Sequence, residues 1–284
     1  MKILIIGLGL IGGSMARALK YNTEHYVAGY DIRRDAVRKA LLVGAIDEIV
    51  ENPDNLDGYD VVMLASYPSV TLDFFNEKAS LVKQGAYVYD LGGIKRQVCE
   101  AGFAAAEKYG FCFVGGHPMA GIQYSGFEAS RESLFHGATM LLVPHRDIDV
   151  RQLDFTVKLF KACGFTSVKI TDAENHDRII AYTSQLAHVL SNAYVKSPTA
   201  PEFKGYSAGS FRDLTRVAHL NAKMWAELFM DNRDNLIREV ECLAHSLLEY
   251  SDAMKAGDTA RLEQLLEDGC RINDEIKADD KEVT

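Results

Sequence analysis

A chain of 284 residues is long enough for one large domain or two medium domains with a substantial hydrophobic core. Its hydrophobic share of 48% and its charged share of 25% are typical of globular proteins. The net charge of −9 argues against a sequence-independent nucleic-acid surface and against an anionic membrane, so we expect neither as a partner. An anionic small molecule would therefore need a local group of Arg or His side chains.

The cysteines are odd in number and widely spaced, which favours neither a disulfide framework nor a zinc site. They are Cys99, Cys112, Cys163, Cys242 and Cys270. We expect all of them to be reduced core residues, and we expect no metal centre. No apolar run reaches the length of about 18 residues that a membrane-spanning helix requires.

The N-terminal segment predicts a dinucleotide-binding βαβ unit. Met1–Ile6 is an aliphatic run typical of a buried parallel strand, and a glycine loop follows it, Gly7-Leu8-Gly9-Leu10-Ile11-Gly12. Apolar residues at helical spacing come next, and a second strand over 26–30 ends at an acid. Glycines at these spacings can also form a simple turn, but strand, loop, helix, strand and acid in register favour binding of a cofactor by residues 7–12.

Each glycine of this loop has a physical reason. Gly7 allows the tight turn out of the strand, and Gly9 lets the backbone approach a pyrophosphate. Gly12 lets the helix lie against the sheet, while the free N–H groups at the helix start bind the anion.

Asp31 is placed to select between the two nicotinamide cofactors. Its carboxylate would accept hydrogen bonds from the adenosine ribose hydroxyls and repel a 2′-phosphate, which favours NAD over NADP. Arg33 and Arg34 weaken this preference, because a guanidinium can bind the extra phosphate. We expect Asp31, Arg33 and Ser66, which follows a later strand, to lie at the cofactor.

The same N-terminal segment has an alternative interpretation. Lys2 followed by the apolar run 3–13 resembles a short secretory leader. Cleavage of such a leader would destroy the nucleotide-binding unit. We therefore expect a cytoplasmic protein.

Strands and helices alternate up to residue 170. We expect strands at 59–65, 86–91, 111–114, 138–143 and 167–170, and helices at 36–43, 71–82, 94–109 and 150–163. This alternation predicts an α/β fold, a Rossmann-type parallel sheet with helices on both faces. Right-handed crossovers would bring all the strand carboxyl ends to one edge, where ligands of such sheets bind.

His117 lies just beyond one of these strands, in the segment Gly115-Gly116-His117-Pro118. Pro118 restricts His117 to an extended backbone, and the glycines leave room for a ligand. An imidazole fixed there could exchange a proton near neutral pH. A turn histidine with a purely structural role is an equally good interpretation of this residue alone.

From residue 172 onward the pattern is helical to the end, so we expect a nucleotide-binding domain over 1–171 and an all-helical domain over 172–284. A segment with two prolines and two glycines, 197–209, should interrupt the helices. The stretch 179–195 has no charged Asp, Glu, Lys or Arg, and it carries Ser184, Gln185 and His188 at helical spacing. This stripe suggests a site or a subunit contact, with a self-satisfied buried helix as the alternative.

Arg212 and Arg216 follow the interrupted segment and share one helix face. In an acidic protein they make a plausible clamp for a carboxylate. A surface ion pair between Asp213 and Arg216 is the alternative. The single tryptophan, Trp225, is expected in the core.

Four motifs occur in a fixed order: the glycine loop, His-Pro-Met-Ala-Gly at 117–121, Ser-Gln-Leu-Ala-His at 184–188 and Phe-Arg-Asp-Leu-Thr-Arg at 211–216. With them, the chain resembles the prephenate and arogenate dehydrogenases of tyrosine biosynthesis over nearly its whole length. The resemblance implies a nucleotide-binding domain followed by a helical domain that dimerises, with the active site between them. It also implies an NAD-dependent oxidative decarboxylation of prephenate to 4-hydroxyphenylpyruvate.

The resemblance assigns roles to individual residues. His117 would hydrogen-bond the ring hydroxyl of the substrate and take its proton as the hydride leaves. Arg212 would bind a substrate carboxylate, and His188 would contact the substrate from the helical domain. Ser184, Gln185 and Arg216 belong to the same motifs and are expected at the substrate.

Two positions depart from the pattern of the family. Gly93 stands where the family commonly has a serine, so the orienting role of that hydroxyl must be supplied elsewhere. The family's Ser-His-Leu-Pro-His segment has Gln185 and Ala187 here, which affects how the substrate side chain is recognised.

Three alternatives to a prephenate dehydrogenase follow from the same residues. Arogenate carries an amino group where prephenate has a keto group, and the sequence offers no clear carboxylate for it. A β-hydroxyacid dehydrogenase would use a lysine on the helical domain, which the stretch 179–195 lacks. A protein that binds NAD without catalysis belongs to a different functional class.

Overall fold

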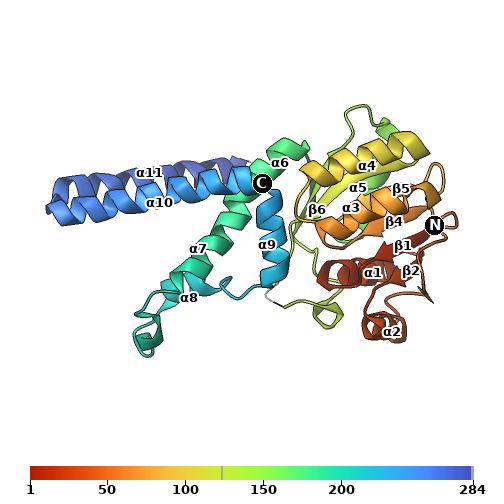
Figure 1. Ribbon diagram of the computed structural model, residues 1–284, viewed down its shortest axis with the longest axis horizontal. Coiled ribbons are helices and arrows are strands. Elements are labelled where there is room, and N and C mark those ends of the chain that lie inside the picture. The colour runs from red at the N-terminus through yellow and green to blue at the C-terminus, as the bar shows by residue number, and fades with distance from the viewer. Residues whose placement is uncertain (123, 283–284) are drawn as a thin grey trace. The chain divides into compact units, whose positions relative to one another are not determined.

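The computed structural model describes residues 1–122 and 124–282 (Figure 1). The chain forms two compact units, Met1–Arg233 and a second one that begins at Asp234. All the residues discussed above as site residues belong to the first unit.

An eight-stranded sheet lies at the centre of the first unit, with the strand order β3-β2-β1-β4-β5-β6-β7-β8. Its strands are β1 (Lys2–Ile6), β2 (Tyr26–Tyr30), β3 (Glu48–Ile49), β4 (Val61–Leu64), β5 (Tyr87–Asp90), β6 (Cys112–Pro118), β7 (Thr139–Pro144) and β8 (Ser167–Ile170). Strands β1 to β6 are parallel, so their carboxyl ends share one edge. The predicted Rossmann-type fold class is confirmed.

Helices cover both faces of the sheet (Figure 1). They are α1 (Leu10–Asn22), α2 (Arg34–Leu42), α3 (Pro68–Glu77), α4 (Arg96–Tyr109) and α5 (Val150–Ala162). Along β1, Ile3 and Ile5 pack with α1, α2 and α5, whereas Leu4 and Ile6 pack with α3 and α4. This alternation follows from the two-residue period of a strand, and it explains why the buried strands are apolar on both faces.

The expectation that every strand is parallel is wrong for the last two. β7 pairs antiparallel with β6, and β8 runs parallel to β7. A parallel connection needs a crossover, usually a helix, but the described part of the link between β6 and β7 contains only the short 3₁₀ helix η2 (Phe127–Ala129). The carboxyl ends of β7 and β8 therefore lie at the edge opposite to the glycine loop.

After β8 the described chain contains helices and no strand, up to residue 282. The first unit continues with α6 (Ala173–Ile180), a π-helical segment η3 (Ala181–Gln185), α7 (Leu186–Tyr194), the short 3₁₀ helix η4 (Ala200–Glu202), α8 (Gly209–Thr215) and α9 (Ala222–Asp231). The predicted helix break falls on η4 and the turns around it. A domain boundary near Thr171 stays a prediction, since α6 to α9 belong to the same compact unit as the sheet.

The second unit consists of α10 (Arg233–Ala256) and α11 (Thr259–Glu282). The two helices form a hairpin, in which Tyr250 donates a hydrogen bond to the carbonyl of Leu265 at 3.1 Å. Cys242 and Cys270 are exposed on this hairpin, so the expectation that all five cysteines are core residues is wrong for these two. Among the described residues, no helix is both long and apolar enough to cross a membrane.

Candidate active site

The glycine loop joins β1 to α1 and has the geometry that its spacing predicts. Gly7 has a positive φ of 92°, and a Cβ there would collide with the carbonyl of Ala65. A Cβ at Gly12 would collide with the carbonyl oxygen of Gly7, so α1 can start this close to the loop only with glycine. These two glycines are therefore required by the protein itself.

Gly9 differs from both, because a Cβ at this position would meet no protein atom within 4 Å. The fold itself therefore does not require glycine at this position. A ligand bound close to the loop would require it, because a side chain would then occupy the space of the ligand. Gly9 is the N-cap of α1. The N–H groups of the first turn, including Leu10, Ile11 and Gly12, have no acceptor within the helix. The loop thus fits the pyrophosphate of a dinucleotide.

Asp31 lies at the end of β2 and faces the same loop. One of its carboxylate oxygens, Oδ2, accepts a hydrogen bond from the N–H of Leu8 at 2.7 Å, and Oδ1 accepts one from the N–H of Arg33 at 2.8 Å. Asp31 is thereby fixed beside the loop, and its contact with a cofactor stays a prediction. At this position a carboxylate can accept hydrogen bonds from the ribose hydroxyls of a dinucleotide.

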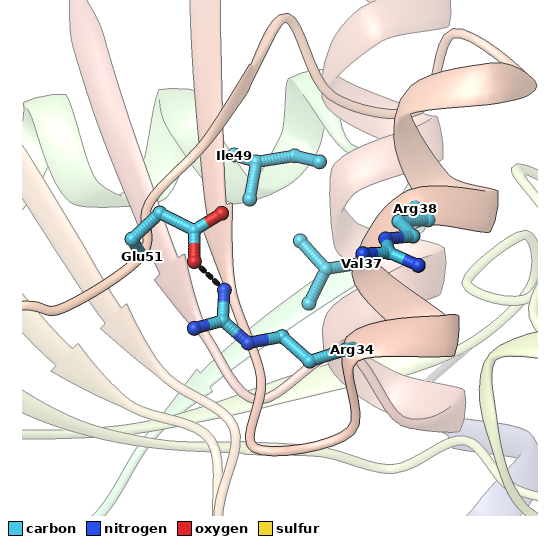
Figure 2. A pocket seen from close by; sticks show the side chains of 5 residues that line it. All are labelled: Arg34, Val37, Arg38, Ile49 and Glu51. Atoms are coloured by element: carbon cyan, nitrogen blue, oxygen red, sulfur yellow. Dashed lines mark ion pairs between the residues drawn. The ribbon is translucent and has the colours of Figure 1, made fainter.

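The two arginines after Asp31 differ in their partners. Arg34 forms an ion pair with Glu51 across a surface pocket of about 320 Å³, which Val37, Arg38 and Ile49 also line (Figure 2). Arg33 remains beside Asp31, with its Nε 4.0 Å from Oδ1. A 2′-phosphate at Asp31 would therefore meet Arg33, while Arg34 is held by Glu51.

Ser66 follows β4 at the same edge, next to the Ala65 carbonyl that contacts Gly7. Its hydroxyl pairs with the hydroxyl of Thr71 at 3.0 Å. The residue is partly exposed and so can be reached by a ligand.

His117 lies near the carboxyl end of β6, which is longer than predicted and includes it. Its Nδ1 is 2.9 Å from Nε2 of His176, the partner that α6 supplies. Burial lowers the pKa of His117 well below the usual value of 6.5, and the nearby His176 and Lys95 add to this effect. His117 is therefore neutral at pH 7 and able to accept a proton.

A buried ion pair fixes the segment between β5 and α4. Lys95 Nζ lies 2.6 Å and 2.8 Å from the two carboxylate oxygens of Asp90 and 3.0 Å from the carbonyl oxygen of Ile94. Asp90 also accepts hydrogen bonds from the N–H groups of Gly92 and Gly116. Both charges are thus fully paired in the interior, which removes most of the cost of burying them. The bond to Gly116 ties this segment to the strand that carries His117.

Ser184 and Gln185 lie in the π-helical segment between α6 and α7. Such π turns are rare and occur frequently at functional sites. Gln185 is buried, donates to the carbonyl of Leu228 at 3.1 Å and accepts from Asn232 at 2.9 Å. Its side chain therefore connects η3 to α9, while Ser184 is partly exposed.

His188, on α7, packs against Trp225 of α9 with ring centroids 3.8 Å apart. Its Nδ1 lies 3.2 Å from the carbonyl of Val217. Burial lowers the pKa of His188. Trp225 is partly exposed, so the expectation that it is a core residue is not met in full.

Arg212 and Arg216 are exposed on and just after α8. Within residues 1–122 and 124–282, neither guanidinium takes part in an ion pair or a side-chain hydrogen bond, and Asp213 does not pair with Arg216. The surface ion pair considered from the sequence is therefore not formed. Arg216 lies close enough to His188 for its charge to contribute to the lowered pKa of that residue.

Residues that the sequence did not single out surround His117. They are Asp90, Lys95, His176 and Asp177. The His-Asp pair in the first helix after the sheet was the available signal, since both side chains are ionisable and lie about one turn after the N-cap, Asp172. Only their burial distinguishes these four residues from ionisable residues on the surface, and burial is known only once the fold is known.

Comparison with known proteins places these features in a family. The family model described as "Prephenate dehydrogenase, nucleotide-binding domain" matches residues 15–169, and that described as "Prephenate dehydrogenase, dimerization domain" matches residues 172–268. A prephenate dehydrogenase of Lactococcus lactis subsp. cremoris is 31% identical over 278 residues, which cover 95% of this chain and 76% of the relative. A cyclohexadienyl dehydrogenase of Zymomonas mobilis is 28% identical over 265 residues, which cover 90% of this chain and 89% of the relative.

A solved structure agrees with these sequence matches. Prephenate dehydrogenase from A. aeolicus, in complex with hydroxyphenyl propionate and NAD+, is 28% identical, with a TM-score of 0.85. The match covers 97% of this chain and 98% of that chain. The chain described here belongs to the prephenate dehydrogenase family.

Proposed function

We propose that this protein is an NAD-dependent prephenate dehydrogenase, which converts prephenate to 4-hydroxyphenylpyruvate by oxidative decarboxylation. The single observation that carries the proposal is the position of His117 near the carboxyl end of β6, at the sheet edge that also carries the glycine loop and Asp31. Family membership supports the choice of substrate. NAD supplies the hydride acceptor when it is bound.

In this proposal His117 is the base. The ring hydroxyl of the substrate donates a hydrogen bond to Nε2 of His117, which takes the proton as the C–H bond at the same carbon breaks. The ring carboxylate leaves as carbon dioxide, and its bonding electrons complete the aromatic ring as a phenolate. The phenolate oxygen then takes a proton back from Nε2 of His117, which gives 4-hydroxyphenylpyruvate and restores the neutral imidazole. Because aromatisation drives the step, the residues mainly have to position the substrate and accept one proton.

Residues of α7 to α9 would bind the rest of the substrate. We assign one substrate carboxylate to Arg212, whose guanidinium is exposed and is the bidentate partner that a carboxylate prefers. His188, Ser184 and Arg216 would contact the substrate from the same side, and Gln185 would act through its bonds to α9.

The cofactor preference is part of the proposal. Asp31 and the pairing of Arg34 with Glu51 favour NAD, while Arg33 is the residue that would tolerate NADP. Residues 7–12, Asp31, Arg33 and Ser66 form the proposed cofactor site.

Arogenate is the second candidate substrate, and one observation favours it. α9 carries two carboxylates one turn apart, Glu227 and Asp231, on either side of Leu228. Glu227 accepts a hydrogen bond from the N–H of Ser69, shortly after Ser66, at 2.7 Å. Burial raises the pKa of Asp231, and the charges of Glu227 and Asp177 add to this effect. A carboxylate there could pair with the ammonium group that distinguishes arogenate from prephenate.

We also propose that the protein acts as a homodimer in the cytoplasm. The match to a domain described as a dimerization domain supports the dimer, as do exposed apolar side chains on α10 and α11. These side chains include Leu247, Leu248, Leu266, Ile272 and Ile276.

The proposal is tested by following the absorbance of reduced nicotinamide with purified protein. Prephenate and arogenate are each supplied with NAD and with NADP. Turnover with prephenate and NAD is the expected result. Turnover with arogenate but not with prephenate would show that arogenate is the substrate. Binding of NADH without turnover in any of the four mixtures would favour a binding protein that senses the cofactor.

A further inference from the structure

A chain of three side chains joined by hydrogen bonds ends at His117, which is partly exposed, whereas the other two are buried. Nδ1 of His117 lies 2.9 Å from Nε2 of His176, and Nδ1 of His176 lies 2.7 Å from Oδ1 of Asp177. His176 is 2% exposed and Asp177 is 0% exposed. The sequence of contacts joins β6 to the first turns of α6.

Asp177 is held as a pure hydrogen-bond acceptor. Its Oδ1 accepts from the N–H of Lys95 and its Oδ2 from the N–H of Arg96, both at 2.9 Å, at the start of α4. The Nε of Arg96 lies 3.4 Å from Oδ2. A helix N-terminus and a guanidinium both stabilise an ionised carboxylate, so the proton between Asp177 and His176 belongs to Nδ1 of His176.

The proton positions along the chain then follow. A neutral imidazole has one N–H and one acceptor nitrogen. Burial lowers the pKa of His176 despite the opposing influence of Asp177, so His176 is neutral and its Nε2 is an acceptor. His117 must therefore donate from Nδ1, which leaves the lone pair on its Nε2.

We propose that His176 and Asp177 are positioning residues that fix His117 in the tautomer whose basic Nε2 faces Gly93. The inference rests on the proposed role of His117 as the base. It extends that role to two residues that touch neither substrate nor cofactor.

Gly93 explains why positioning from the Nδ1 side is needed. A Cβ at Gly93 would lie 3.9 Å from Nε2 of His117, so a serine there would place its hydroxyl beside that nitrogen. Glycine leaves this face of the imidazole to the substrate. The orienting contact that the family resemblance implies for a serine is supplied here by His176, from the opposite side of the ring.

The arrangement also serves the protonated state. When Nε2 accepts the proton, the O–H bond of the substrate breaks, an N–H bond forms, and His117 becomes an imidazolium. Its Nδ1–H continues to donate to His176, and Asp177 stabilises the new charge through His176. The charged groups facing the two imidazoles are Lys95, Asp90, Asp177 and Arg96, and Asp231 of α9 faces Asp177.

The first experiment measures the tautomer of His117 in the unliganded protein, by ¹⁵N NMR of the protein labelled at histidine. His117→Asn assigns the resonances. The expected result is a protonated Nδ1 and an unprotonated Nε2 at pH 7.5. A proton on Nε2 would overturn the proposal, and this measurement does not depend on turnover of any substrate.

The second experiment uses a matched pair at His176. His176→Gln retains an acceptor oxygen for Nδ1 of His117, whereas His176→Leu retains volume without an acceptor. We expect kcat with prephenate to fall by about 10- to 100-fold in His176→Leu and much less in His176→Gln. The KM for prephenate and the Kd for NAD should change less than about threefold, since neither ligand contacts the residue.

Asp177→Asn is the third variant, because it keeps the shape of the side chain and removes its negative charge. The amide oxygen at the position of Oδ1 can still accept from Nδ1 of His176 and from the N–H of Lys95, so we expect the tautomer of His117 to remain, while kcat falls and its pH profile shifts because the imidazolium of His117 loses a stabilising charge. Equal losses in kcat, KM and Kd for NAD, with an unchanged pH profile, would indicate a merely structural role and reject the proposal. If the wild-type protein turns over neither cyclohexadienyl substrate, the proposed function fails, while the NMR experiment still decides the inference.

Discussion

The sheet edge and the helices α6 to α9 build the proposed site from different parts of the chain. At the sheet edge, backbone N–H groups and open space around Gly9 form the proposed cofactor site, with Asp31 as its main side chain. On the helices, side chains form the site, and His176, Asp177 and Gln185 are buried with all their polar contacts satisfied within the described residues. The arrangement of the sheet edge is determined by local backbone geometry, whereas the arrangement of the helices is determined by contacts between residues far apart in the sequence.

This difference separates binding from chemistry in a testable way. Changes at His117 and on the helices should affect turnover or substrate affinity, and changes at the loop should affect cofactor affinity. A variant that alters both equally would contradict the comparison.

The largest effect is expected for His117→Asn. Asparagine keeps a polar side chain but offers no basic nitrogen, so kcat with prephenate should fall by about 10³-fold, within the range for loss of a general base. The Kd for NAD, measured by fluorescence titration, should remain unchanged because the glycine loop is intact. His145→Asn, at an exposed histidine after β7, is the control that should retain full activity. Turnover that survives in His117→Asn would remove His117 as the base.

Arg212→Ala should act on the substrate alone. Loss of a charge-assisted pair to a carboxylate is expected to raise the KM for prephenate by about 10- to 100-fold, as expected for ~1.5–3 kcal/mol. Arg212→Lys keeps the charge without the planar fork and should give an intermediate KM. Steady-state kinetics at saturating NAD provides the measurement, and an equal loss of NAD affinity would argue against the clamp.

The sheet edge is tested by Asp31→Ser. Removing the carboxylate should weaken NAD and relieve the repulsion of a 2′-phosphate, changing the ratio of kcat/KM for NAD over NADP by about tenfold. Arg33→Ala is the matched variant, because it removes the group that could bind the 2′-phosphate. It should lower kcat/KM for NADP. An unchanged ratio in Asp31→Ser would reject the role assigned to this acid.

The sequence predicts the glycine loop and Asp31 well, because their spacing reflects a tight turn and a helix N-terminus. It also predicts most of the strands, since aliphatic runs are buried on both faces of the sheet. It misses the antiparallel direction of β7, because strand direction depends on the connection and not on the strand's own residues.

The positioning of His117 is the part that sequence reasoning could not reach. His176 lies 59 positions from His117, and Asp177 lies 82 positions from Lys95, whose N–H it accepts. No periodicity links residues so far apart. The resemblance to a family pointed to His117 and showed that Gly93 lacks the family's serine, but it did not name a replacement, and the structure places His176 at Nδ1 of His117.

The smallest expected effect is on stability at acidic pH, and it concerns the His117–His176 pair. Burial lowers the pKa of both histidines below the value of 6.5 that the unfolded chain is expected to have. Above pH 6.5 both states are neutral and neither histidine affects the free energy of unfolding. As the pH falls below 6.5, the unfolded chain binds protons that the folded protein does not, so stability falls by up to about 1.4 kcal/mol per pH unit for each histidine, until the pH reaches the folded pKa.

Urea unfolding at pH 7.5, 6.5 and 5.5, at fixed protein concentration, measures this loss. His176→Gln should reduce it, since the variant removes one titrating group and the neighbour that lowers the pKa of His117. His145→Asn should leave the loss unchanged, because no contact joins that exposed histidine to the pair in the described residues. Equal loss of stability in the wild-type protein, His176→Gln and His145→Asn would mean that the two imidazoles bind protons at the same pH in the folded and unfolded states. That result would contradict the lowered pKa of both histidines.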